Sequence, residues 1–211
     1  MSLPDLPAPT TMTPPTATSR RAVIAWGLWD WGSASINAVA TSFVFTVYLT
    51  GSAFGDAATT SQALSLALTL AGLVVLITAP ITGQRSDASA HRKRWLGINT
   101  GVVVLMLALM IFVREDTAYL WFGLTLLAVG TVFYELASVN YNAMLSQIST
   151  PRTVGKVSGF GWGMGYLGGI VLLLVLYFGL IKPEVGLFGV TAADGMAVRV
   201  SMLLAAIWFA L

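Results

Sequence analysis

Long apolar runs alternate with short polar segments along the chain after residue 21. A helix needs about 20 apolar residues to cross a hydrocarbon core of about 30 Å, and most of the runs reach that length. The pattern predicts an all-α membrane protein in which residues 22–211 form one bundle of six helices. The last helix is expected to stop at Leu211, too early to cross. The expected spans are about 22–49, 62–82, 95–113, 118–145, 157–181 and 196–211 (incomplete).

Residues 1–21 precede the first span and are rich in Pro and Thr. They lack the apolar stretch of a cleaved signal peptide, and their composition is typical of disordered segments. We expect a disordered cytoplasmic tail.

Basic residues alternate between the two sides of the predicted bundle. Counting Lys and Arg on each side gives eight against three, so the positive-inside rule places the N-terminus in the cytoplasm. The eight are Arg20, Arg21, Arg85, Arg92, Lys93, Arg94, Arg152 and Lys156. The three are Arg114, Lys182 and Arg199.

Composition supports the membrane class and excludes several functions. Hydrophobic residues make up 56% of the 211 residues and charged residues 9%, a balance typical of integral membrane proteins. A net charge of +2 indicates no nucleic-acid partner. The absence of cysteine excludes thiol catalysis and disulfides. No catalytic set or metal-ligand spacing is found, so we expect no enzyme, no cofactor and no metal site.

Two predicted spans carry an acidic residue inside an apolar run. Asp30 lies in the first span and Glu135 in the fourth. An ionised carboxylate at mid-membrane costs about 2.5–3.5 kcal/mol, so each should face protein or water rather than lipid. Helical spacing places further polar residues on the same faces. These faces are Trp26, Asp30, Ser33, Asn37 and Thr41 in the first span, and Thr131, Glu135, Ser138 and Asn142 in the fourth.

This pattern suggests that the two carboxylates converge on one central cavity. Asp30 and Glu135 could each bind and release a proton, or hold the ammonium group of a substrate, and Ser33, Asn37, Ser138 and Asn142 would supply hydrogen bonds. A purely structural role, with both acids bonded between helices, is the alternative interpretation.

The loop between the second and third spans has a recognisable motif. Gly83-Gln-Arg-Ser-Asp87, followed by His91-Arg92-Lys93-Arg94, resembles the signature of the major facilitator superfamily, although Ala88 and Ala90 stand where the family has a basic residue and a second Gly. The resemblance implies that Gly83, Asp87 and Arg92 act in gating between two halves of a transporter. A basic loop that only sets topology is the alternative.

Two longer stretches resemble the vacuole effluxer branch of this superfamily, and together the resemblance covers nearly all of residues 22–180. They are AWGLWDWGSASIN and YELASVNYNAMLSQISTPRTVGKVSGFGWGMGYLGG. The branch implies a transporter, and its fungal members are associated with amino-acid export. It also implies twelve helices in two halves, so this chain would be the N-terminal half and would need a C-terminal half or a second copy as partner.

The fifth span has glycines at every fourth position. Gly161, Gly165 and Gly169 form a bare face suited to close helix packing. A neighbouring face with Ser158, Trp162 and Tyr166 could line the cavity. The tryptophans near span ends predict interfacial anchors, and these are Trp26, Trp29, Trp31, Trp95 and Trp121.

The sequence thus predicts a secondary active transporter of small solutes in the cell (inner) membrane, proton-coupled and exporting amino acids or related metabolites. Its partners would be the lipid bilayer, a small-molecule substrate and a second bundle. A channel and a membrane-embedded binding or assembly subunit are the rival functions.

Overall fold

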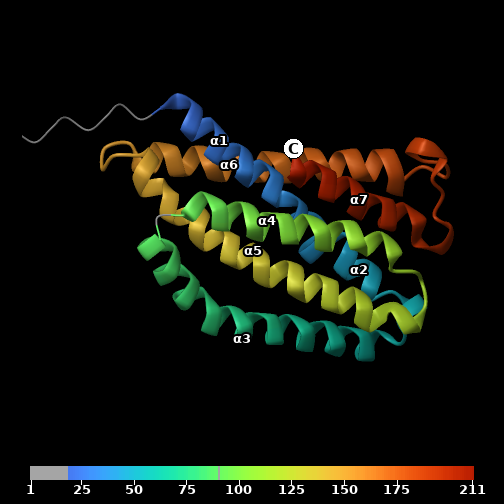
Figure 1. Cartoon of the computed structure of the whole chain (residues 1–211). Coiled ribbons are helices and arrows are strands. Elements are labelled where there is room, and N and C mark those ends of the chain that lie inside the picture. Colours follow the sequence, from blue (N-terminus) through green and yellow to red (C-terminus); the bar gives the residue numbers. More distant parts are fainter. Residues whose placement is uncertain (1–18, 90) are drawn as a thin grey trace, which may run out of the picture.

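The computed structural model describes residues 19–89 and 91–211, and among these the side chains of residues 85–89 lie outside the description. Residues 1–18 of the predicted tail therefore lie outside the described residues. The rest of the chain forms one bundle of roughly parallel helices with short connections (Figure 1).

The first span is a composite helix, and the others are mostly regular. It comprises α1 (Arg20–Ala34), a π-helical segment η1 (Ser35–Phe43) and α2 (Phe45–Leu49). The remaining long helices are α3 (Ala57–Ser89), α4 (Arg92–Leu109), α5 (Leu120–Ile148), α6 (Val154–Leu176), which continues as η5 (Tyr177–Ile181), and α7 (Met196–Ala210).

The prediction of an all-α membrane bundle is confirmed. Within the described part of the chain, six helices are long and apolar enough to cross a membrane. The sixth helix, α7, begins at Met196 as expected. A 3₁₀ turn at Ala193–Gly195 precedes it, and the span Ala193–Ala210 has 18 residues. That this span is incomplete stays a prediction.

The second span begins earlier than the hydrophobic pattern indicates. Asp56 stands directly before α3, and the backbone N–H of Thr59 donates a hydrogen bond of 3.0 Å to its Oδ1, the geometry of an N-cap. Hydrogen bonding from Thr59 lowers the pKa of the Asp56 carboxyl. The cap extends the helix back to Ala57, into residues that the pattern placed in a loop. At its other end α3 contains Pro80 and curves (Figure 1).

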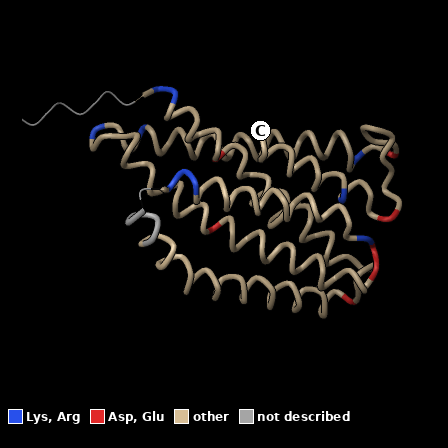
Figure 2. Tube along the Cα trace, in the orientation of Figure 1, with Lys and Arg blue, Asp and Glu red and all other residues tan. Residues whose placement is uncertain are grey.

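Charged residues gather at the two ends of the bundle and leave the middle almost free of them (Figure 2). The N-terminal turns of α1, α4 and α6 lie at one end of the bundle and carry Arg20, Arg92 and Lys156. We call this the basic end. Most acidic residues lie at the opposite end, together with Arg114, Lys182 and Arg199.

Apolar packing is concentrated toward the end opposite the basic one. The large core cluster joins η1 and α2 to the later parts of α4 and α6, the first part of α5, and α7. Its fully buried members include Phe45, Leu107, Leu127, Leu176 and Met202. A smaller cluster at the basic end contains Trp26, Tyr141, Ile148 and Val157.

Arg199 and Tyr48 make polar contacts at the end opposite the basic one. Buried Arg199 of α7 donates from Nε to the carbonyl of Ile111 at 2.6 Å and pairs through an η nitrogen with Asp194 at 2.9 Å. The Tyr48 hydroxyl donates to the carbonyl of Val113 at 3.0 Å. Together they fix the turn after α4 against the first and sixth spans.

Candidate functional site

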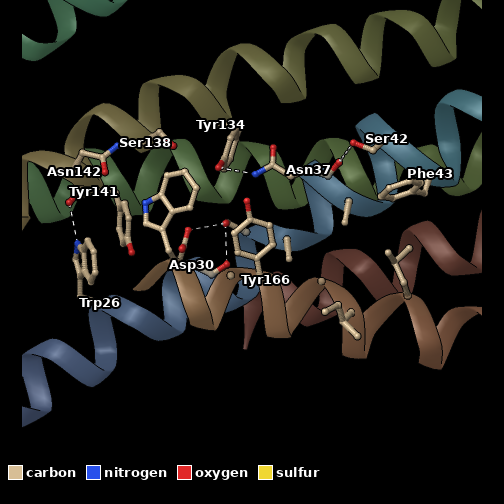
Figure 3. A pocket seen from close by; sticks show the side chains of 18 of the residues that line it. Trp26, Asp30, Asn37, Ser42, Phe43, Tyr134, Ser138, Tyr141, Asn142 and Tyr166 are labelled. Carbon is tan, nitrogen blue, oxygen red and sulfur yellow. Dashed lines mark hydrogen bonds between the residues drawn. The ribbon is translucent and has the colours of Figure 1, made fainter. Parts of the chain in front are cut away.

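A pocket of about 570 Å³ opens between the first span, α5 and α6 (Figure 3). This volume is typical of sites for small molecules. The polar residues that line it are Asp30, Ser33, Asn37, Ser42, Ser138, Asn142 and Ser158, and its aromatic residues are Trp26, Phe43, Tyr134, Tyr141, Trp162 and Tyr166.

Asp30 is half-buried in the wall of this pocket. Its carboxylate lies against Gly165 of α6, where an added Cβ would come within 2.7 Å of Asp30 Oδ2. Among the described residues, its carboxylate accepts a hydrogen bond only from Ser33 Oγ, which reaches Oδ1 at 3.4 Å and the Asp30 carbonyl at 2.9 Å. Oδ2 is therefore available to a solute or to water in the pocket.

The glycines of α6 allow the first span to approach closely. An added Cβ on Gly161 would collide with the Trp26 ring, and one on Gly169 would meet Ala34 and Ala38 at 3.4 and 3.5 Å. Gly168, which the spacing did not single out, is the tightest against backbone, because its Cβ would lie 2.5 Å from the carbonyl oxygen of Trp31.

The π-helical segment η1 changes which residues of the first span face the pocket. Trp26, Asp30, Ser33 and Asn37 line it as the helical spacing predicts, but Thr41 does not. In a π-helix the bonds run from residue i to i+5, so each turn takes up more residues than in an α-helix. Ser42 and Phe43 consequently take the place predicted for Thr41, and Ser42 Oγ donates to the carbonyl of Asn37 at 2.8 Å.

Glu135 is not among the residues that line the pocket. It is exposed on α5, while Tyr134, Ser138, Tyr141 and Asn142 present the face that borders the pocket. Thr131 is also absent from the lining, and its hydroxyl donates to the carbonyl of Leu127 at 2.9 Å. The expected convergence of two carboxylates on one cavity is therefore wrong: the pocket holds Asp30 alone.

A hydrogen bond joins the polar face of the first span to α5. Asn37 Nδ2 donates to the Tyr134 hydroxyl at 2.7 Å and so connects η1 to α5 across the pocket wall (Figure 3). The amide side chain of Asn37 is thereby held beside Tyr134, between Asp30 and Ser42 along the pocket (Figure 3).

Trp26, Trp29 and Trp31 pack between helices, so their interpretation as interfacial anchors is wrong. Trp26 is buried, stacks on Tyr141 at 4.3 Å between ring centroids, and donates from Nε1 to the Tyr141 carbonyl at 3.0 Å. Trp29 also stacks on Tyr141, at 4.3 Å between ring centroids, and donates from Nε1 to Thr100 Oγ1 at 2.9 Å. Trp31 stacks on Trp208 at 5.4 Å. Trp95 and Trp121 are exposed, as anchors would be.

The loop motif is described only in part. Arg92 donates from an η nitrogen to the carbonyl of Ala143 at 3.0 Å, which ties the start of α4 to α5. An added Cβ on Gly83 would be in ordinary contact with Val139 of α5 at 3.6 Å. The side chain of Asp87 lies outside the described residues.

Sequence reasoning missed the aromatic part of α5. Tyr134 and Tyr141 lie seven residues apart, on the same face as Ser138, so the spacing that selected the polar residues could have selected these as well. In contrast, Ser158, Trp162 and Tyr166 were expected near the cavity, and the structure brings all three into the lining.

Chemically, the pocket presents groups that suit a small solute. Among the described residues, no group of three His, Cys, Asp or Glu side chains could hold a metal ion. The lining provides one carboxylate, amides and hydroxyls for hydrogen bonds, and aromatic rings for contact with apolar or cationic groups.

Comparison with known proteins gives one informative similarity. The chain is similar to a protein of Bacillus subtilis (strain 168) named as the uncharacterised MFS-type transporter YxiO, with 23% identity over 193 residues. These residues make up 89% of this chain and 44% of the relative, so the chain spans less than half the relative's length. No protein-family model and no solved structure matches the chain. The similarity supports a relationship with the major facilitator superfamily.

Proposed function

We propose that this chain is one half of a secondary active transporter that moves small solutes across a membrane with protons. The observation that carries the proposal is the Asp30 carboxylate facing an open pocket in the middle of a membrane bundle. Intramembrane acids are expensive and tend to mark ion or substrate paths. The similarity to a transporter supports the same function.

The pocket is open on the side between α5 and α6, where Trp162 and Tyr166 are 63% and 68% exposed. We propose that a second bundle covers this side, supplied by a C-terminal half or by a second copy of the chain. The solute would lie between the two bundles, as carriers that work by alternating access require. Rocking of one bundle against the other would then expose the pocket to each side in turn.

Within this site we assign charge recognition or proton coupling to Asp30. Ser33 orients its carboxylate, and Asn37, Ser138 and Asn142 supply hydrogen bonds to the solute. Glu135 lies outside the pocket, so we propose it only as a proton-binding group and not as a solute contact. Gly83, Asp87 and Arg92 are proposed to act in gating between the bundles.

The distribution of charge supports the orientation of the protein. With the basic end in the cytoplasm, the bundle obeys the positive-inside rule (Figure 2). We propose that the protein lies in the cell (inner) membrane with its N-terminus inside, and that amino acids or related metabolites are its solutes.

The test uses the full-length carrier in proteoliposomes. A thermal-stabilisation screen with amino acids, peptides, sugars and drugs over a pH series first identifies a solute. Asp30→Asn should then abolish uptake driven by a proton gradient, while counterflow at saturating solute stays measurable. Asp56→Asn is the matched control, because Asp56 is an exposed acid outside the pocket and Asn caps a helix as well as Asp does.

Unchanged coupling in the Asp30 variant would remove this residue from the mechanism. Currents without saturation would instead indicate a channel, and the absence of both flux and binding would indicate an assembly subunit.

A further inference from the structure

The charge in the pocket has a single sign. Asp30 is the one carboxylate among the described residues that line the pocket, and these residues include no Lys, Arg or His. Its nearest polar contact within the described residues is the neutral hydroxyl of Ser33. A negative group that faces a pocket without a basic partner favours a cation at that position.

Aromatic rings surround the same space. Tyr166 directly follows Gly165, the residue that the Asp30 carboxylate touches. Figure 3 shows the side chains of Asp30 and Tyr166 in the same part of the pocket. Trp162 lies one turn earlier on α6, with its ring 6.0 Å from that of Tyr166. Their large exposed fractions mean that a solute could contact the ring faces without moving other side chains.

The rings on the opposite wall are held in fixed positions. Trp26 and Trp29 each stack on Tyr141 with ring centroids 4.3 Å apart, and Trp29 also stacks on Tyr134 at 6.1 Å. The hydroxyl of Tyr141 is buried and has no hydrogen-bond partner among the described residues. The stacking fixes the positions of Trp26 and Tyr141, which line the pocket, so these two side chains need little further ordering when a solute binds.

Aromatic faces combined with one carboxylate form the chemistry that recognises organic cations. The ring quadrupole attracts an ammonium group, and a carboxylate oxygen without other partners accepts its N–H bonds. Asn37, Ser138, Asn142 and Ser158 could bond further polar atoms of the solute. An anionic solute would meet Asp30 without a compensating positive charge.

Resting on the transport function above, we propose that the pocket recognises the positively charged ammonium group of an organic amine, held by Asp30 and by the rings of Trp162 and Tyr166. The apolar or aromatic remainder of the amine extends along α6 toward Ile170 and Leu173, which also line the pocket. A pocket of about 570 Å³ has room for an amine that carries one ring.

The test compares three probes of similar shape on the purified full-length carrier in nanodiscs: phenylethylamine, phenylethanol and phenylpropionate. Binding is read by quenching of tryptophan fluorescence and by thermal stabilisation. We expect phenylethylamine to bind about 10-fold or more tightly than the neutral alcohol, since hydrogen bonds to charged groups contribute in that range. Phenylpropionate should bind most weakly.

Variants locate the effect. Asp30→Asn should weaken phenylethylamine binding about 10-fold to 100-fold and leave phenylethanol unchanged. Tyr166→Leu should weaken the amine about 2-fold to 30-fold, the range of cation–π contacts, and Tyr166→Phe should largely restore it. Both Tyr166 variants alter a highly exposed side chain, so they keep the test informative if Asp30→Asn fails to fold. Asp56→Asn serves again as the control.

Equal binding of amine and alcohol, or preference for phenylpropionate, would overturn the proposal. So would an amine affinity that neither Asp30→Asn nor Tyr166→Leu changes. The two proposals fail separately: amine binding without transport of any solute would refute the carrier and keep the ammonium site. Transport of another solute, with no amine binding, would do the reverse.

Discussion

Gly168 provides the sharpest test of how α6 packs on the first span. A Cβ built on this residue would lie 2.5 Å from the carbonyl oxygen of Trp31 and 3.0 Å from its Cα. Both are backbone atoms of a helix, so no side-chain rotation can relieve the contact. Gly168→Ala must therefore push α1 and α6 apart.

The magnitude follows from comparison with Gly163 of the same helix. No atom lies within 4 Å of a Cβ built on Gly163, so Gly163→Ala gains the usual helix preference of alanine, about 0.5–1 kcal/mol. Gly168→Ala has the same gain and, in addition, the cost of overpacking, typically about 1–3 kcal/mol. The difference in the free energy of unfolding between the two variants is thus the packing cost alone.

The assay is thermal unfolding of the purified chain in detergent, followed by circular dichroism. For a chain of this size the packing cost corresponds to a difference in Tm of about 2–12 °C, with Gly168→Ala the less stable variant. Equal melting temperatures would refute the close approach of α1 and α6, and with it the position of Asp30 against Gly165.

Two further predictions concern contacts that hold the bundle together. Arg199→Gln should lower the free energy of unfolding by about 1.5–3 kcal/mol, because it removes a charged donor from the Ile111 carbonyl, 2.6 Å away in a buried site. Arg114→Gln, at an exposed arginine, is the control, and equal effects of the two variants on Tm would contradict the buried contact. Asn37→Ala and Tyr134→Phe should show a coupling energy of about 0.5–1.5 kcal/mol in a double-mutant cycle of chemical unfolding. We expect a value toward the lower end of this range because Asn37 is exposed, and additive effects would mean that the hydrogen bond does not form.

The number and order of the helices could be predicted from the sequence because runs of apolar residues determine them almost alone. The position of helix ends could not, since ends depend on local hydrogen bonds. Asp56 extends α3 back to Ala57, and a 3₁₀ turn at Ala193–Gly195 lengthens the last span. Neither feature alters mean hydropathy, so the hydrophobic pattern could not reveal them.

The candidate site was predictable to the extent that the helices are regular. Asp30, Ser33 and Asn37 follow an α-helical repeat and line the pocket. The repeat fails at η1, where the wider turns replace Thr41 by Ser42. Glu135 was misplaced for a different reason: on α5 the aromatic residues Tyr134 and Tyr141 define the inner face, and an analysis of polar spacing alone does not consider them.

The uneven distribution of apolar packing has a mechanical consequence. Phe45, Leu107 and Met202 interlock several helices at one end, whereas the opposite end depends on the small group around Trp26 and Tyr141. Stiffness should therefore decline along the bundle axis, from a rigid extremity to a more compliant one. We expect the bundle to deform most easily at its basic end, because small movements of the helices break the fewest buried contacts there.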